Sequence, residues 1–349
     1  MKTVVVGCGA VGGTIGAYLA RAGHDVTLVD SWWQQIDAIR RDGLSVWTPD
    51  GSFHVQLPAL HVDGLHDLAG PCDLAIIATK AYDAEWAYRL IDPYLAPEAA
   101  VLFAQNGVVE ELFGRFADLD RVIGTVVNFA AECFEPGTVR RTLTGGWPSL
   151  TIGELDGSGS TRLMRIREHL SPVGDVRASD NILSVLWSKL ALNAMTNATG
   201  AVTRATTAIL WGEPGFLEVA VQAGAETVAV ALAAGIEVTP VFDRIDPALL
   251  LRAHGGDEAA ATEVADLLRT IAAGRRGEKE NRPSMLQDVL KGRRTEVDYI
   301  PGHVSRRGAE NGVQTPLNDR LVELVRDVEA GRLAGGPANL ELILSALPR

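Results

Sequence analysis

The chain has 349 residues, 47% of them hydrophobic and 22% charged, and its formal net charge at pH 7 is −12. That length is enough for two domains with separate cores, and the composition is typical of a globular protein. The negative charge, with no large basic cluster to offset it, argues against nucleic acid as a partner, because phosphate binding needs clustered lysine and arginine.

The cysteines argue against a disulfide framework. Cys8, Cys72 and Cys133 are isolated and odd in number, and none forms a Cys-x-x-Cys pair. No pair of cysteines accompanies a pair of histidines in the spacing of a structural zinc site. We therefore expect a cytoplasmic protein without a bound metal.

Two segments imitate membrane-targeting sequences. The apolar N-terminus resembles a secretory signal, but five glycines between Gly7 and Gly16 weaken the helix that a signal needs. The apolar segment 219–236 is interrupted by Gln222 and Glu226. We expect neither a signal peptide nor a membrane span.

The N-terminal segment has the pattern of a dinucleotide-binding turn. A β-branched strand from Lys2 to Val6 leads into a glycine-rich turn, and a helical run to about Ala22 follows. The first glycine allows a tight turn, the second lets a pyrophosphate approach the backbone, and the third lets helix and strand pack closely. The helix N-terminus then offers N–H groups to the phosphates. A turn without nucleotide is the less favoured alternative. The expected contact residues are Gly7, Cys8, Gly9, Ala10, Val11 and Gly12.

Asp30 is expected to select the cofactor. It ends the second predicted strand, 26–29, and lies 18 positions after the last glycine of the turn. A carboxylate there accepts hydrogen bonds from the ribose 2′-hydroxyl and repels a 2′-phosphate. Trp32 and Trp33 bring no positive charge next to it, although Arg40 and Arg41 lie further along. We predict NAD(H) as cofactor, with NADP(H) as the alternative.

Further strands should extend a parallel sheet. Continuous apolar runs at 73–78 and 100–104 are typical of strands covered on both faces. Ligands bind beyond the carboxyl ends of such strands. Lys80 and Asn106 lie at these ends, so we expect both at the cofactor edge, the alternative being ordinary solvated loop residues.

The rest of the N-terminal half completes a Rossmann domain. We predict a hairpin over 44–57 around Pro49-Asp50-Gly51, a strand over 121–127 and a second hairpin over 137–152. From about Asp180 helical spacing takes over. We place the Rossmann domain at 1–178 and a helical domain at 179–349, so the fold class is α/β plus all-α. Helices are expected at 182–198, 216–234, 247–254, 258–276, 316–330 and 339–347.

The helix predicted over 182–198 carries one polar stripe. Lys189, Asn193 and Asn197 are spaced at i, i+4 and i+8, so they share a face that apolar residues flank. Such a stripe must bind either a neighbouring element or a ligand. A surface lysine followed by two interior asparagines is the alternative. Unlike arginine, a lysine can be tuned by burial to give up a proton near neutral pH.

Taken together, these motifs resemble the ketopantoate reductase (2-dehydropantoate 2-reductase) family over most of the chain. The matching pieces are the glycine turn, Ala78-Thr79-Lys80, Gln105-Asn106-Gly107, the Lys189–Asn193–Asn197 row, Ser284-Met285-Leu286-Gln287-Asp288 and Thr295-Glu296-Val297-Asp298-Tyr299-Ile300. The resemblance implies an NAD(P)H-dependent reductase of a 2-oxo acid that binds nicotinamide and substrate between its two domains.

The resemblance also implies residue roles. Lys189 would donate the proton, with Glu296 as a second catalytic or cofactor-binding group. Asn106 and Lys80 would contact the cofactor. The residues expected to hold the substrate are Asn193, Asn197, Asn281 and Ser284. A small-molecule substrate is thus the expected partner, and a homodimer the candidate assembly.

Two departures from the family pattern change the expectation. Members commonly have basic residues after the second strand, where this chain has Asp30 and two tryptophans. An asparagine expected eighteen residues beyond the catalytic lysine is Thr207 here. The first puts NADP in doubt, and the second puts ketopantoate in doubt.

Other readings remain open. The substrate is then another 2-oxo acid, or a bulkier ketone or secondary alcohol. An opine dehydrogenase is disfavoured, since no histidine lies near the lysine helix. A dinucleotide sensor without catalysis is the alternative from another class.

Overall fold

The computed structural model describes residues 1–108, 113–142, 148–274 and 281–347. The chain divides into two compact units. The first consists of Met1–Gln105 and Val109–Ile182, and the second of Asn106–Val108 and Leu183–Arg349. The three residues from Asn106 to Val108 therefore pack with the helical part of the chain, although the strand that ends shortly before them, at Phe103, belongs to the first unit.

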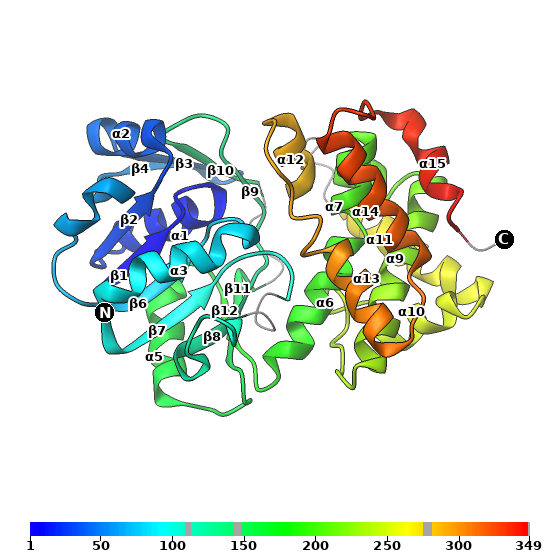
Figure 1. Cartoon of the computed structure of the whole chain (residues 1–349), viewed down its shortest axis with the longest axis horizontal. Helices are drawn as coiled ribbons and strands as arrows, with labels where there is room; N and C mark the ends of the chain where they lie inside the picture. The colour runs from blue at the N-terminus through cyan, green and yellow to red at the C-terminus, as the bar shows by residue number, and fades with distance from the viewer. Residues whose placement is uncertain (109–112, 143–147, 275–280, 348–349) are drawn as a thin grey trace. The chain divides into compact units, whose positions relative to one another are not determined.

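The first unit is built around a largely parallel sheet (Figure 1). In the described part of the chain, eight strands lie in the order β12-β11-β8-β7-β6-β1-β2-β5, and only the β8–β11 pair is antiparallel. Its central strands are Val-, Ile- and Leu-rich and buried on both faces. The strand bounds are β1 Thr3–Val6, β2 Val26–Asp30, β5 Ala59–His61, β6 Cys72–Ile77, β7 Leu95–Phe103, β8 Val122–Val127, β11 Leu150–Glu154 and β12 Val176–Ala178. This confirms the predicted Rossmann architecture.

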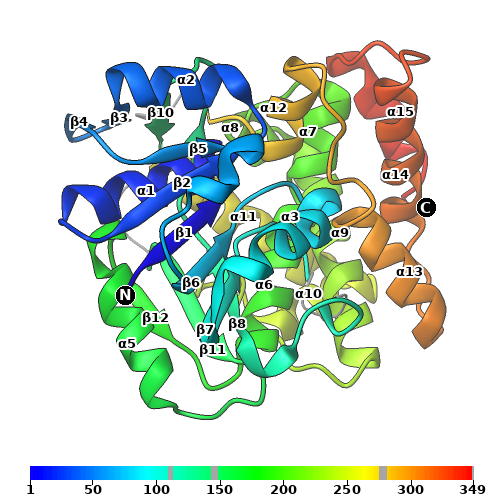
Figure 2. The same ribbon diagram turned by 60° about the vertical axis from the view of Figure 1, so that its left-hand side comes forward.

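Helix α1 lies between this sheet and a smaller one. It packs against β2 on one side and against the small sheet on the other (Figure 2). The small sheet has the described strands β4 Gly51–Val55, β3 Leu44–Thr48, β10 Thr138–Arg141 and β9 Ala131–Glu132, in that order. Among the described residues, the α-helices of this unit are α1 Ala10–Arg21, α2 Trp33–Asp42, α3 Ala84–Ile91 and α5 Thr161–Leu170.

One predicted hairpin is confirmed and the other is wrong. Strands β3 and β4 pair antiparallel around the predicted turn. Residues 137–152 do not form a hairpin, because β10 pairs with β3 and β9 whereas β11 pairs with β8 and β12. Both segments alternate apolar and polar residues, as the strands of a hairpin do, but each strand belongs to a different sheet. Positions 143–147 lie outside the described residues.

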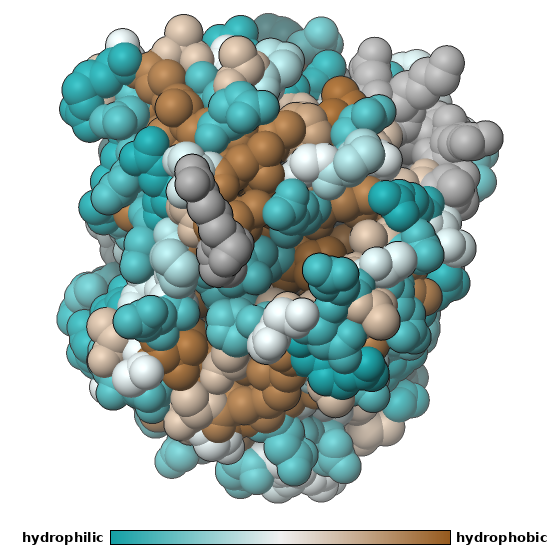
Figure 3. Space-filling view, turned by 90° about the vertical axis from the view of Figure 1, so that its right-hand side faces the viewer, coloured by the Kyte–Doolittle hydropathy of each residue, from teal (hydrophilic) through white to brown (hydrophobic). Residues whose placement is uncertain are grey.

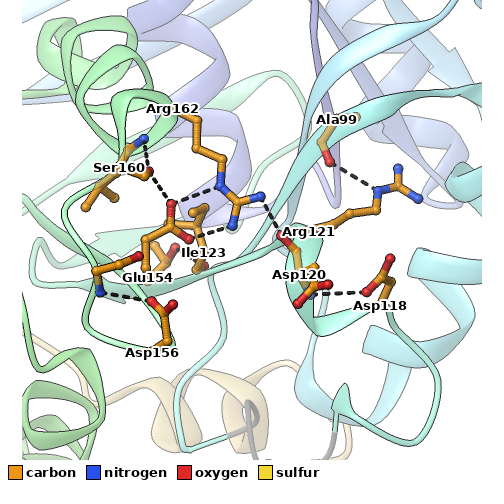
Figure 4. A network of polar contacts seen from close by, with 12 residues as sticks. Ala99, Asp118, Asp120, Arg121, Ile123, Glu154, Asp156, Ser160 and Arg162 are labelled. Atoms are coloured by element: carbon orange, nitrogen blue, oxygen red, sulfur yellow. Dashed lines mark hydrogen bonds and ion pairs between the residues drawn. The ribbon is translucent and has the colours of Figure 1, made fainter.

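A buried carboxylate joins β11 to α5 (Figure 4). Arg162 forms a bidentate ion pair with Glu154: its Nε donates to Oε1 at 2.9 Å and its Nη2 donates to Oε2 at 2.5 Å. Ser160 caps α5 by accepting from the Leu163 N–H at 3.0 Å, and its hydroxyl donates to Glu154. Burial raises the pKa of Glu154, but the hydrogen bonds from Arg162 and Ser160 outweigh burial and hold that pKa below its usual value.

We predict that Arg162→Met lowers the free energy of unfolding by about 2 kcal/mol at pH 7, because it leaves Glu154 charged and short of donors. The lowered pKa means that the stabilisation exists above pH 4.5, the ordinary value, and is lost as the pH falls. Urea unfolding should therefore show the deficit of the variant shrinking below pH 4.5. Arg165→Met, at an exposed arginine of the same helix, is the control. A deficit that is equal at pH 7 and pH 4 would contradict this role.

The second unit is helical, as predicted. Its helices are α6 Ile182–Ala194, which starts at the boundary of the first unit, α7 Asn197–Thr203, α8 Thr207–Leu210, α9 Pro214–Ala233, α10 Pro247–His254, α11 Glu258–Gly274, α12 Ser284–Leu290, α13 Pro301–Asn311, α14 Pro316–Glu329 and α15 Leu340–Leu344. The predictions at 216–234, 247–254 and 316–330 are confirmed within two residues. Helix α13 was not predicted, since Gly302, Gly308 and several charged residues obscure its apolar face.

Helix α9 is the core of this unit. Among the described helices it is long and apolar enough to cross a membrane, yet 72% of its apolar window is buried inside the protein. Glu226 in its middle is fully buried and accepts from the N–H groups of Leu317 and Asn318 at 3.1 and 3.0 Å. This carboxylate thus caps the first turn of α14 from another helix. Burial raises the pKa of Glu226, and these hydrogen bonds oppose the shift.

The apolar side chains on the surface of the second unit form several separate patches. Figure 3 shows brown patches separated by hydrophilic side chains. The large apolar side chains exposed on this unit are Ile209, Leu232, Leu290 and Leu342, between 38% and 47% exposed.

Candidate active site

The fold requires a glycine at two of the three glycine positions in the turn. Gly7 has φ +101°, and a Cβ there would lie 2.6 Å from the Ala78 carbonyl carbon and from the Thr79 nitrogen. A Cβ on Gly12 would lie 1.9 Å from the Gly7 oxygen. The two outer glycines therefore serve the close packing of turn, helix and strand β6.

Gly9 differs from both. Its φ of −75° is open to any residue, and a Cβ there would meet no atom within 4 Å. The fold itself does not require a glycine at this position. It is the N-cap of α1 and has no side chain with which to cap the helix, and no acidic residue lies in the first turn. The helix N-terminus and an open backbone position together fit a pyrophosphate.

Asp30 is fixed beside this turn. One carboxylate oxygen accepts from the Cys8 N–H, and the other accepts from the Trp32 N–H at 2.8 Å. Each oxygen keeps a further lone pair for a ribose hydroxyl. Cys8 itself is fully buried, and its pKa is raised by burial first and by Asp30 second. Its backbone, rather than its thiol, therefore contributes to the site.

Gln35 supports the turn and was missed in the sequence. This fully buried side chain donates to the Cys8 carbonyl at 2.7 Å and accepts from the Gly137 N–H at 2.7 Å. It thereby fixes the turn against the small sheet. No sequence pattern predicts this role, because a glutamine near the start of a helix is usually exposed to solvent.

The other predicted cofactor residues lie as follows. Ala10 and Val11 are partly buried in the first turn of α1. Lys80 is partly buried just beyond β6, as the N-cap of a 3₁₀ turn at Ala81–Asp83.

In the second unit, four predicted residues form one hydrogen-bonded row. Asn193 Nδ2 donates to Asn106 Oδ1 at 3.2 Å, and Asn106 Nδ2 donates to Ser284 Oγ at 3.4 Å. Ser284 Oγ in turn donates to Asn197 Oδ1 at 3.0 Å. Asn193 and Asn197 are 5% and 4% exposed. The row thus joins α6, α7, the first residue of α12 and Asn106, which lies three residues after the end of β7.

Lys189 lies one helical turn before Asn193 on α6 and is partly buried. Glu296 is 2% exposed in the segment before α13. Asn281 is partly buried, and its carbonyl accepts from the Thr207 N–H at 3.0 Å. These three residues belong to the same unit as the row.

The prediction of a single helix over 182–198 is wrong. Helix α6 ends at Ala194, and α7 starts at Asn197 after a turn at Met195 and Thr196. The Thr196 hydroxyl donates to the Leu192 carbonyl at 3.3 Å, which competes with helix continuation. Lys189 and Asn193 therefore share a stripe on α6, whereas Asn197 is brought to the row by the start of α7.

Comparison with known proteins identifies the family of the chain. The family model described as Ketopantoate reductase PanE/ApbA matches residues 3–157, and the model of its C-terminal domain matches residues 181–329. The chain belongs to the ketopantoate reductase family. Members of this family are NAD(P)H-dependent oxidoreductases that act on a small keto or hydroxy substrate.

Three relatives illustrate the likeness. The 2-dehydropantoate 2-reductase of Archaeoglobus fulgidus is 30% identical over 332 residues, covering 95% of this chain and 98% of the relative. A ketopantoate reductase from Ralstonia eutropha JMP134 has a TM-score of 0.76 at 30% identity, covering 95% and 99%. D-mandelate dehydrogenase with NADH and anilino(oxo)acetate has a TM-score of 0.78 at 25% identity, also covering 95% and 99%.

The glycine turn allows a direct test. Gly9→Ala should fold with an unchanged thermal midpoint, because its Cβ meets nothing, but should bind dinucleotide at least about ten-fold more weakly by blocking phosphate approach. Gly12→Ala should instead lower the thermal midpoint, because its Cβ would overlap the Gly7 oxygen. Differential scanning fluorimetry and calorimetric titration with NADH separate the two effects. Wild-type affinity in Gly9→Ala would contradict the assignment.

Proposed function

We propose that this ketopantoate reductase relative reduces a 2-oxo acid to a 2-hydroxy acid, with NADH as its preferred donor. The observation that supports it most is the row from Asn193 through Asn106 and Ser284 to Asn197, one helical turn beyond Lys189. Buried neutral polar groups arranged in this way suit a small polar ligand.

The row has complementary ends. Asn193 uses its amide nitrogen within the row, so its oxygen stands at one end, and Asn197 uses its oxygen, so its nitrogen stands at the other. An acceptor and a donor match the hydroxyl and the carboxylate of a 2-hydroxy acid. Asn281, close in sequence to Ser284, completes the proposed substrate set.

Reduction needs a hydride on one face of the carbonyl and a proton for the developing alkoxide. The bound nicotinamide supplies the hydride. Lys189 holds the proton on Nζ and donates it to the alkoxide oxygen, and Asn193 and Asn197 keep the carbonyl oriented toward it. Glu296 would steady the ammonium or bind the nicotinamide ribose, and Asn106 and Lys80 would contact the cofactor.

A bulkier 2-oxo acid is the second candidate substrate. Thr207 stands where the family pattern has an asparagine, so a shorter side chain with a hydroxyl and a methyl group replaces a carboxamide. The likeness to D-mandelate dehydrogenase, whose name gives an aryl-substituted 2-hydroxy acid as substrate, also supports a bulkier substrate. Both candidates use the same Lys189 chemistry.

The experiment is a screen of NADH consumption with 2-oxo acids of graded size, from pyruvate through ketopantoate to phenylglyoxylate. In the best substrate, Lys189→Met should lower kcat at least about 10³-fold and leave the Kd for NADH within about two-fold. Lys189→Arg should be equally inactive, because arginine keeps the charge but does not release a proton.

Lys2→Met, at a lysine of the first unit, is the matched control and should retain full activity. NADH binding without consumption of any 2-oxo acid would favour the sensor instead. Loss of NADH binding in Lys189→Met with unchanged single-turnover chemistry would overturn the role of Lys189.

Asp30 carries the proposed preference for NADH. Asp30→Asn removes the charge that repels a 2′-phosphate while keeping a hydrogen-bonding side chain, so the ratio of kcat/KM for NADH over NADPH should fall at least about ten-fold. Asp25→Asn, at a carboxylate five residues earlier, is the control. An unchanged ratio in Asp30→Asn would contradict a ribose contact.

A further inference from the structure

Two buried oxygen atoms beside the glycine turn lack hydrogen-bond partners. They are Thr79 Oγ1 and Gln105 Oε1, and the described part of the chain offers neither of them a partner. Gln105 is 7% exposed. A buried polar group that forms no hydrogen bond costs free energy, so native proteins rarely keep one without a use.

Both oxygens lie at the carboxyl edge of neighbouring strands. Thr79 follows β6 and Gln105 follows β7, and these strands pair in parallel. The Gln105 Nε2 donates to the Ile77 carbonyl at 2.9 Å, so its carboxamide reaches across to the end of β6. The Thr79 backbone nitrogen lies 2.6 Å from where a Gly7 Cβ would stand. The two side chains therefore flank the turn that faces a pyrophosphate.

The strand order decides which half of a dinucleotide they face. Strand β1, which leads into the glycine turn, has β2 on one side and β6 on the other. Asp30 at the end of β2 marks the side of the adenosine ribose. A dinucleotide that crosses the turn extends its second half over the ends of β6 and β7, where Thr79 and Gln105 stand.

We propose that the Thr79 hydroxyl and the Gln105 carboxamide oxygen bind the nicotinamide ribose-phosphate half of the cofactor. The hydroxyl donates to a phosphate or ribose oxygen, and the carboxamide oxygen accepts from a ribose hydroxyl or the nicotinamide amide. Each atom thereby gains the partner that it lacks in the protein alone. The inference rests on the use of a nicotinamide dinucleotide by this family and not on the substrate or on NADH preference.

Thr79→Val tests this by keeping the shape and removing the hydroxyl. The ligand-free variant should unfold about 2 °C higher, because an unsatisfied buried group is gone. Its Kd for NADH should rise about ten-fold, whereas its Kd for AMP, which carries only the adenosine half, should stay unchanged. Thr79→Ser should retain NADH affinity, and Gln105→Met should weaken NADH but not AMP.

Thr199→Val is the matched control. Thr199 is 1% exposed on α7, and its hydroxyl also lacks a partner among the described residues. It should raise the thermal midpoint without changing NADH affinity, since Thr199 belongs to the second unit and follows neither β6 nor β7.

If the proposal holds, Thr79→Val raises the thermal midpoint of the ligand-free protein but weakens NADH binding in calorimetric titration. Unchanged NADH affinity in Thr79→Val, or equal weakening of NADH and AMP, would overturn it. If the wild type binds NADPH rather than NADH, the proposed NADH preference fails, and the same comparison with NADPH still decides the role of Thr79.

Discussion

The hydrogen-bonded row from Asn193 to Asn197 is the constraint on which the proposed chemistry depends. All four members are neutral polar groups: Asn193 and Asn197 are buried, and Asn106 and Ser284 are partly buried. Burial without a hydrogen-bond partner would be costly. By bonding to one another in sequence, the four side chains satisfy this requirement and fix their relative positions. A carbonyl bound at such a row would meet groups that need little rearrangement, which is the condition for effective proton transfer.

The row depends in turn on a glycine. Asn106 is followed by Gly107, whose φ is +101° and whose Cβ would lie 2.6 Å from the Tyr299 carbonyl oxygen. Only glycine tolerates both the backbone angle and this close approach. The Asn-Gly pair therefore has a steric reason: the second residue lets the chain pack closely enough for the first to reach Asn193 and Ser284.

The nucleotide turn follows the same principle in the first unit. Gly7 and Gly12 satisfy internal packing, whereas Gly9 and the side chains around it leave room and hydrogen-bonding capacity for a ligand. Asp30 is held by two backbone N–H groups, and Gln35 holds the backbone that presents one of them. The carboxylate is thus oriented in the protein alone, which would reduce the ordering required by the proposed ribose contact.

The sequence predicts those parts that local chemistry determines. The glycine turn, the buried strands and the helices at α9 and α10 follow from periodicity and turn residues. The break between α6 and α7 does not follow, because Met195 and Thr196 are tolerated in helices. The pairing partners of β10 and β11 are set by distant strands. Gln35 acts only through residues 27 and 102 positions away.

The most direct test of the central claim is a crystal structure of the protein with NAD⁺ and oxamate, an unreactive analogue of a 2-oxo acid. The account predicts the oxamate carbonyl oxygen within about 3 Å of Lys189 Nζ, with polar contacts to Asn193 and Asn197. Oxamate bound away from this row, or Lys189 Nζ turned into solvent with the analogue in place, would contradict it.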